Sequence, residues 1–105
     1  MRKLVLSLLA AFVLALPVLT GPAAEAATTR TWNRMAHCES TSRWHVNTGN
    51  GYYGGLQFAT ASWLANGGAD FASRADLASR AEQITIANRY YERAGLSPWG
   101  CAHAA

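Results

Sequence analysis

Residues 38–58 gather more reaction-capable side chains than any other part of the 105-residue chain. The stretch begins with Cys38 and Glu39 and continues through a glycine-rich turn of polar and aromatic residues to Gln57. Cleavage of a glycosidic bond needs a proton donor for a poor leaving oxygen, and a carboxylic acid held partly away from water is the usual donor. Glu39 is the candidate for this role, and the alternative is a glutamate that simply faces solvent at the end of a helix.

The residues that follow Glu39 are suited to holding a sugar polymer. Hydroxyl and amide groups exchange hydrogen bonds with sugar hydroxyl and acetamido groups, and Thr48 and Gln57 are the candidates. Flat aromatic rings can lie against sugar rings, and Tyr52 and Trp63 are the candidates for this contact. Core packing is the alternative for the aromatic residues of so small a domain. We therefore expect this stretch to form the wall of a cleft that contains Glu39.

Three helices are expected to position these groups. Apolar residues at helical spacing predict a first helix over residues 32–39, with Thr28 among its candidate caps, so that Glu39 lies on or beside the core-facing stripe. A second, short helix is expected over residues 59–65. A Ser-Arg-Ala-Glu capping box opens a third helix over residues 79–93.

A short β-hairpin is expected between the first two helices. Asn50-Gly51 is a strong hairpin-turn signal, and it lies between short segments with strand character at residues 44–47 and 52–53. Such a hairpin is too short to be stable alone, so it must lie against helices. The expected fold class is therefore α+β, mainly helical.

The first 26 residues have the pattern of a signal peptide. A positive start is followed by an apolar run over residues 4–16 and by Ala24-Glu25-Ala26, which places small residues where a signal peptidase cleaves. A membrane span needs about 20 apolar residues, and this run is shorter. We expect a secreted mature domain over residues 27–105, without stable membrane insertion; a retained anchor is the alternative.

The mature domain would carry seven arginines and five carboxylates, a formal charge of +2. These charges form no basic run, so no nucleic-acid footprint is visible. A weak positive charge would suit an anionic polymer such as a cell wall, among other partners. No metal site and no cofactor are expected, because the histidines and cysteines lack metal-ligand spacing.

Cys38 and Cys101 are the only cysteines of the chain, and export would place them in an oxidising compartment. A bridge between them would close nearly the whole mature domain, which loop-entropy estimates value at roughly 4 kcal/mol. Two free thiols are the alternative.

Several of these segments together resemble the resuscitation-promoting factor domain of actinobacteria, a member of the lysozyme-like superfamily. The matching segments are Cys38-Glu39-Ser40, Trp44, residues 47–58, Ser62-Trp63, residues 78–84 and Trp99-Gly100-Cys101. The resemblance covers essentially the whole mature chain. It departs at residues 41–43, where Thr41-Ser42 stand in place of the two glycines usual in the family and Arg43 precedes Trp44, and at Ser62, where the family pattern has threonine.

The resemblance implies a small lysozyme-like fold with a Cys38–Cys101 bridge. It also implies a secreted, cell-wall-associated enzyme that cleaves peptidoglycan between N-acetylmuramic acid and N-acetylglucosamine, with Glu39 as its single acid/base. The reaction is either hydrolysis, as in a muramidase, or formation of a 1,6-anhydro product, as in a lytic transglycosylase. Ser62 joins the expected substrate contacts on this basis. The expected partners are glycan strands and a peptidoglycan endopeptidase, and the expected state is a monomer. A module that binds wall glycan or signals without cutting it, and a small disulfide-stabilised interaction protein, are the alternatives.

Overall fold

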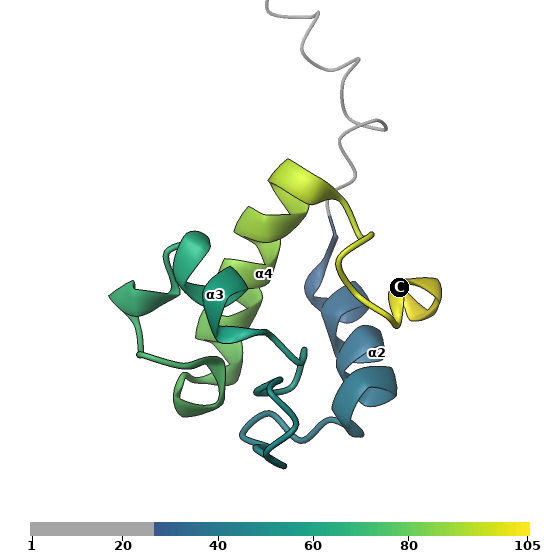
Figure 1. Cartoon of the computed structure of the whole chain (residues 1–105). Coiled ribbons are helices and arrows are strands. Elements are labelled where there is room, and N and C mark those ends of the chain that lie inside the picture. The colour runs from purple at the N-terminus through teal and green to yellow at the C-terminus, as the bar shows by residue number, and fades with distance from the viewer. Residues whose placement is uncertain (1–26) are drawn as a thin grey trace, which may run out of the picture.

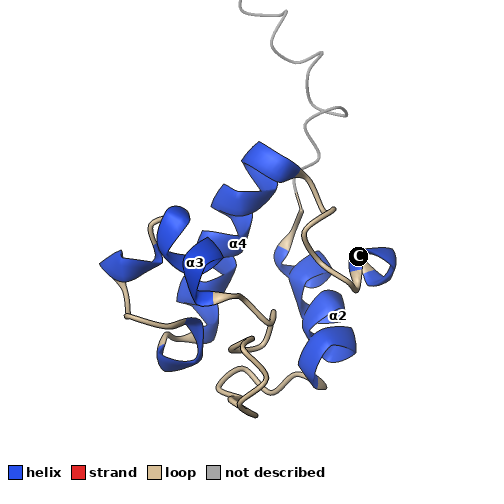
Figure 2. Ribbon diagram, viewed as in Figure 1, coloured by secondary structure: helices blue, strands red, loops and turns tan. Residues whose placement is uncertain are grey.

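The structure is a computed structural model and describes residues 27–105 (Figure 1). The predicted signal peptide over residues 1–26 lies outside the described residues. Within residues 27–105, three α-helices and three single 3-10 turns make up the helical structure (Figure 2). The helices are α2 (Thr29–Ser40), α3 (Thr60–Ala65) and α4 (Arg80–Ala94), and the 3-10 turns are η2 (Gly68–Asp70), η3 (Ala75–Leu77) and η4 (Ala102–Ala104).

The caps of the two long helices are those that the sequence predicts. The Thr28 side chain accepts a hydrogen bond from the Thr31 N–H at 3.2 Å, so α2 begins three residues earlier than expected. Ser79 and Glu82 form the reciprocal capping box at the start of α4. Gly95 ends α4 with a φ of 64°, a conformation that glycine adopts readily. The three predicted helices are thus confirmed.

The core is built from buried side chains of α2, α3 and α4, of the loops between them and of the C-terminal segment. The indole N–H of Trp32 donates to Asn88 Oδ1 at 2.7 Å, which joins α2 to α4 by a polar contact inside the core. Trp99 packs against Trp32 with ring centroids 4.9 Å apart, so the C-terminal segment closes this core. The other large buried side chains are Met35, Leu56, Phe58, Trp63, Ile84 and Ile86.

The predicted hairpin is absent, and this part of the expected α+β class is wrong. Within residues 27–105 the β-type pairing consists of two isolated antiparallel bridges, Asn47 with Tyr53 and Tyr53 with Phe58. Tyr53 exchanges both backbone hydrogen bonds with Phe58, each at 2.9 Å. One residue pairs with two different segments, so no two-stranded ladder extends. The described chain is mostly helical.

Local side-chain hydrogen bonds explain why the hairpin does not form. Asn47 Oδ1 accepts from the Gly49 N–H at 3.1 Å, and Asn50 Oδ1 accepts from the Tyr52 N–H at 3.0 Å. Asparagine turns of this kind compete with ladder hydrogen bonds for the same backbone groups. The Asn-Gly pair therefore turns the chain, as predicted, but it forms a polar loop and not a hairpin.

A disulfide joins Cys38 to Cys101, with their Cα atoms 6.0 Å apart, and confirms the predicted bridge. It ties the last turn of α2 to the segment just before η4, which lies beside α2. None of the helices within residues 27–105 has the length and apolar composition needed to span a membrane.

Residues 41–43 depart from the family pattern, and the structure shows what the departure does. Thr41 and Ser42 adopt left-handed backbone conformations, with φ of 53° and 60°. The N–H groups of these two residues donate to the His37 and Ala36 carbonyls and end α2. Arg43 Nε donates to the Ser40 carbonyl at 2.9 Å and to Thr41 Oγ1 at 3.2 Å, so its side chain covers the helix end. The left-handed backbone at positions 41 and 42 favours glycine, but threonine and serine occupy these positions and the Arg43 side chain lies over them.

Replacing both Thr41 and Ser42 by glycine is expected to raise the free energy of unfolding by about 1 kcal/mol. A left-handed conformation costs a non-glycine residue roughly 1–2 kcal/mol. Part of this gain is offset by the greater freedom of glycine in the unfolded chain and by the lost Thr41 hydroxyl. Urea unfolding of both proteins measures the difference. Thr85→Gly, in the exposed interior of α4, is the matched control and should lose roughly 0.3–0.5 kcal/mol. An unchanged or lowered stability of the double variant would contradict the expectation.

Candidate active site

Two adjoining hollows form a cleft between the loop after α2 and the segment after α4. They share four lining residues, Tyr52, Gln57, Pro98 and Trp99. The larger hollow, of about 280 Å³, is completed by Glu39 and Gly100. The smaller one, of about 60 Å³, is completed by Phe58, Ala59, Ser62 and Tyr90. The cleft thus brings together four of the six side chains predicted to act on substrate, namely Glu39, Tyr52, Gln57 and Ser62.

Glu39 is held at one end of this cleft from two directions. It lies in the last turn of α2 and is partly buried. Its Oε2 accepts a hydrogen bond from the Cys101 backbone N–H at 2.9 Å, while the preceding residue, Cys38, is bonded covalently to Cys101. No other hydrogen bond to this carboxylate is present within residues 27–105. One oxygen is therefore fixed, and the other is left for a ligand in the cleft.

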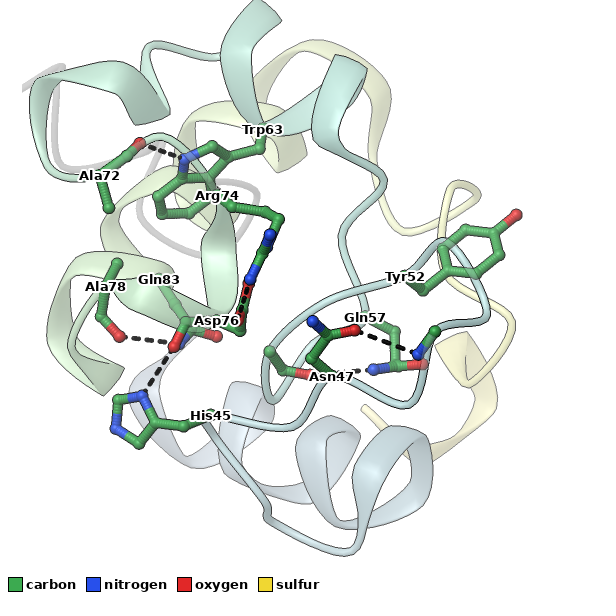
Figure 3. Close-up of polar contacts among 12 residues, drawn as sticks. His45, Asn47, Tyr52, Gln57, Trp63, Ala72, Arg74, Asp76, Ala78 and Gln83 are labelled. Carbon is green, nitrogen blue, oxygen red and sulfur yellow. Dashed lines mark hydrogen bonds and ion pairs between the residues drawn. The ribbon is translucent and has the colours of Figure 1, made fainter.

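Glu39 is the one carboxylate among the residues that line the cleft. Asp76 lies elsewhere, buried and paired with Arg74, which donates to it at 2.6 and 2.9 Å (Figure 3). The hydrogen bond from the Arg74 guanidinium holds the pKa of the Asp76 carboxyl below its ordinary value. Asp70 is exposed and lies 3.6 Å from Arg89. Neither aspartate is placed to act together with Glu39.

Gln57 is fixed in the cleft wall by both ends of its amide. Its Nε2 donates to the Gly54 carbonyl at 3.1 Å, and its Oε1 lies 3.4 Å from the Asn50 amide nitrogen. Its backbone is left-handed, with a φ of 53°, and its neighbours in sequence, Leu56 and Phe58, are both buried. Tyr52 is half-exposed and points away from the loop (Figure 3). Its ring is thus free to lie against a ligand.

Ser40 and Gln83 attach this loop to the helices through Gly55. The Gly55 carbonyl lies 2.9 Å from Ser40 Oγ, and the Gly55 N–H donates to Gln83 Oε1 at 3.0 Å. The Gln83 amide also donates to the Trp44 carbonyl at 2.7 Å. A side chain at position 55 would collide with the Trp44 ring, so this close approach requires glycine. Gln83, which sequence reasoning missed as a functional residue, therefore positions the loop that carries Gln57.

Trp63 does not contribute a ring face to the cleft, and its interpretation as a sugar platform is wrong. The side chain is fully buried, and its indole N–H donates to the Ala72 carbonyl at 2.8 Å (Figure 3). Its ring packs edge-on against Phe58, with centroids 5.4 Å apart. Core packing, the alternative for the aromatic residues, applies here.

Thr48 and Ser62, the two predicted hydroxyl contacts, have different positions. Thr48 is exposed in the loop and is not among the residues that line the two hollows, so its contact with substrate stays a prediction. Ser62 lines the smaller hollow, with its hydroxyl 3.5 Å from the Tyr90 hydroxyl.

The opposite wall of the cleft comes from Pro98, Trp99 and Gly100, which the sequence did not identify as site residues. Trp99 is 6% exposed, and this small exposed part faces both hollows. The signal that could have found this wall is the cysteine pair. A bridge from Cys38 to Cys101 requires the residues before Cys101 to lie against the end of α2, beside Glu39.

Within the part of the chain that the structure describes, no three histidine, cysteine, aspartate or glutamate side chains are grouped as metal ligands would be. The chemistry of the cleft therefore has to be argued from one carboxylate, amide and hydroxyl groups, and aromatic rings.

Comparison with known proteins identifies similar sequences. Residues 26–102 match the family described as "Transglycosylase-like domain". The chain is 46% identical over 83 residues to resuscitation-promoting factor Rpf1 of Corynebacterium glutamicum. The aligned region covers 79% of this chain and 43% of that protein. The chain is 49% identical over 76 residues to resuscitation-promoting factor RpfA of Mycobacterium tuberculosis, covering 72% of this chain and 19% of the relative. Resuscitation-promoting factor Rpf of Micrococcus luteus is 47% identical over 76 residues, with coverages of 72% and 33%. The match thus spans less than half the length of these three relatives.

Proposed function

The chain belongs to the transglycosylase-like domain family, and from this premise we propose that it is a secreted enzyme that cleaves peptidoglycan. The bond cleaved is the β-1,4 linkage between N-acetylmuramic acid and N-acetylglucosamine, and Glu39 is the acid/base. One observation carries this proposal: Glu39 is the single carboxylate of a cleft that also presents Tyr52, Gln57 and Ser62. Membership of the family implies a lysozyme-like fold, which agrees with the mostly helical architecture.

The proposed first step is proton transfer from the Glu39 carboxyl to the bridging glycosidic oxygen. As the bond between that oxygen and C1 of the muramic acid breaks, positive charge develops on the sugar ring. In this proposal the amide of Gln57 and the hydroxyl of Ser62, which line the cleft, would hold sugar substituents during this step. The hydrogen bond from the Cys101 N–H to Glu39 Oε2 would orient the carboxyl group.

The second step depends on what attacks C1. Hydrolytic mechanisms with two carboxylates use the second one as a nucleophile or to activate water. The cleft described above has one, so we assign the attack to the muramic acid's own C6 hydroxyl. That hydroxyl gives its proton to the Glu39 carboxylate, the C1–O6 bond forms, and the acid is regenerated. The product is a 1,6-anhydro sugar, and no water is consumed.

The relatives' printed names suggest the biological setting. Because they are called resuscitation-promoting factors, we propose that this protein acts outside the cell, at the wall, in remodelling linked to resuscitation or growth. It would act as a monomer on glycan strands, with a peptidoglycan endopeptidase as its candidate partner. No cofactor is part of the proposal.

Mass spectrometry of the fragments released from purified cell wall tests the reaction directly. The expected fragments end in anhydro-muramic acid and are lighter by one water than the hydrolysis products. Fragments with hydrated ends would show that the reaction is hydrolysis and not transglycosylation. The mechanism would then require a group that activates water. The absence of any soluble fragment, while the protein still sediments with the wall, would favour the non-catalytic binding module.

A further inference from the structure

A further hollow, separate from the two that form the cleft, lies along α2 and is lined by two arginines and two histidines. It measures about 510 Å³ and is lined by Arg30, Asn33, Arg34, His37, Cys38, His103 and Ala104. We call it the basic groove. Arg30, Arg34 and His37 recur at four- and three-residue spacing, so they share one stripe of the helix. The other wall is the terminal turn η4, which packs beside α2.

No acidic side chain faces the arginines of the basic groove within residues 27–105. Both arginines are exposed, no carboxylate is among the lining residues, and neither arginine takes part in an ion pair there. Arg34 Nε donates to the Ala104 carbonyl at 3.3 Å, which holds its guanidinium at the rim. Two guanidinium groups on one helical stripe are suited to paired hydrogen bonds with carboxylates.

The basic groove and the cleft are linked along the chain by two short segments. Cys38 lines the groove, and the next residue, Glu39, lines the cleft. On the second segment, Gly100 lines the cleft and His103 lines the groove, with the disulfide to Cys38 between them. His103 Nε2 lies 4.0 Å from Cys38 Sγ. Residues of the groove and of the cleft are therefore close neighbours in the sequence on both segments, which the disulfide joins.

We propose that the basic groove binds free carboxylates of the peptide stems carried by the glycan strand in the cleft. The inference rests on the proposed function, since it takes the substrate to be peptidoglycan. Its stems branch from muramic acid, the sugar whose bond would lie at Glu39, and they end in carboxylates. Arg30 and Arg34 would pair with these groups, and the aliphatic parts of their side chains would line the path. The groove would make the protein select strands whose stems keep their carboxylates over strands in which these are amidated.

The test measures binding of three probes to the oxidised mature protein. The probes are the disaccharide of N-acetylglucosamine and N-acetylmuramic acid with a tripeptide stem, the same compound with its stem carboxylates amidated, and the disaccharide without peptide. None of them contains the scissile bond. We expect the carboxylate form to bind about tenfold more tightly than the amidated form at low salt, and this preference to fade at high salt.

The variants locate the effect in the groove. Arg30→Gln combined with Arg34→Gln should remove the tenfold preference while the melting temperature stays close to that of the parent. Arg80→Gln combined with Arg89→Gln is the matched control, because these two exposed arginines line neither the basic groove nor the cleft. This double variant removes the same formal charge and should keep the tenfold preference. A parent protein without the preference, or an Arg30/Arg34 variant that keeps it, would overturn the proposal. Equal loss in both double variants would also overturn it, because the effect would then be one of net charge. A parent that binds a phosphodiester polymer but not the carboxylate probe would assign the groove to another partner.

The two proposals can fail separately. Cleavage of glycan strands stripped of peptide depends on the cleft alone, so the parent and the Arg30/Arg34 variant should cut them at rates within about twofold of each other. A parent protein that does not cleave these stripped strands would contradict the proposed function, even if it showed the preference for the carboxylate probe.

Discussion

Replacing Glu39 by glutamine is expected to lower the rate of wall cleavage by about a thousandfold. A positioned general acid or base typically contributes a factor of 10²–10⁴, and here one group would perform both roles. The amide oxygen of glutamine can still accept the hydrogen bond from the Cys101 N–H, so the cleft keeps its shape. What the amide cannot do is deliver a proton to the leaving oxygen. The measurement is the initial rate at which labelled fragments are released from purified wall.

Glu92→Gln is the matched control for this experiment. Glu92 is exposed in α4 and does not line the cleft, and its replacement removes the same charge. Its cleavage rate should stay within about twofold of the parent. Both variants should also unfold within a few degrees of it. A Glu39→Gln protein that releases fragments at the parental rate would show that Glu39 is not the catalytic group.

The helices could be predicted from the sequence because their signals are local. The Ser79–Glu82 capping box and the Thr28 cap depend on residues three apart, and both form as expected. The candidate site residues Glu39 and Gln57 could also be picked out locally, since they lie in one short stretch that the structure brings to one cleft. The disulfide needed only the count of cysteines and the expectation of export.

The features that sequence reasoning missed depend on contacts between distant segments. Gln83 lies on α4, yet its amide binds the backbone of Trp44 and Gly55, which no local pattern indicates. Trp63 would suit a sugar platform by type, but the close approach of Gly68 to its ring and the Ala72 carbonyl enclose it in the core. The hairpin failed for the opposite reason, because local asparagine turns displaced the longer-range pairing.

Removing the disulfide with Cys38→Ala and Cys101→Ala is expected to cost about 4 kcal/mol of unfolding free energy. The bridge spans 63 residues, and a closed loop of that length restricts the unfolded chain strongly. So small a domain buries too little apolar surface to absorb this loss easily. The effect should also reach the cleft. Trp99 and Gly100 form one wall, and the Cys101 N–H that orients Glu39 lies on the same segment.

Guanidinium unfolding of the parent and the double variant, each with and without reductant, separates these contributions. The parent should lose about 4 kcal/mol on reduction and approach the variant, which has no thiol and should not respond to reductant. Under conditions where the variant is still folded, its cleavage rate should fall further than its unfolded fraction explains, because the released segment no longer holds Glu39. Equal stability of the oxidised parent and the variant would contradict the first expectation. A folded variant with the parental cleavage rate would show that the helix and the loop position Glu39 without the C-terminal wall.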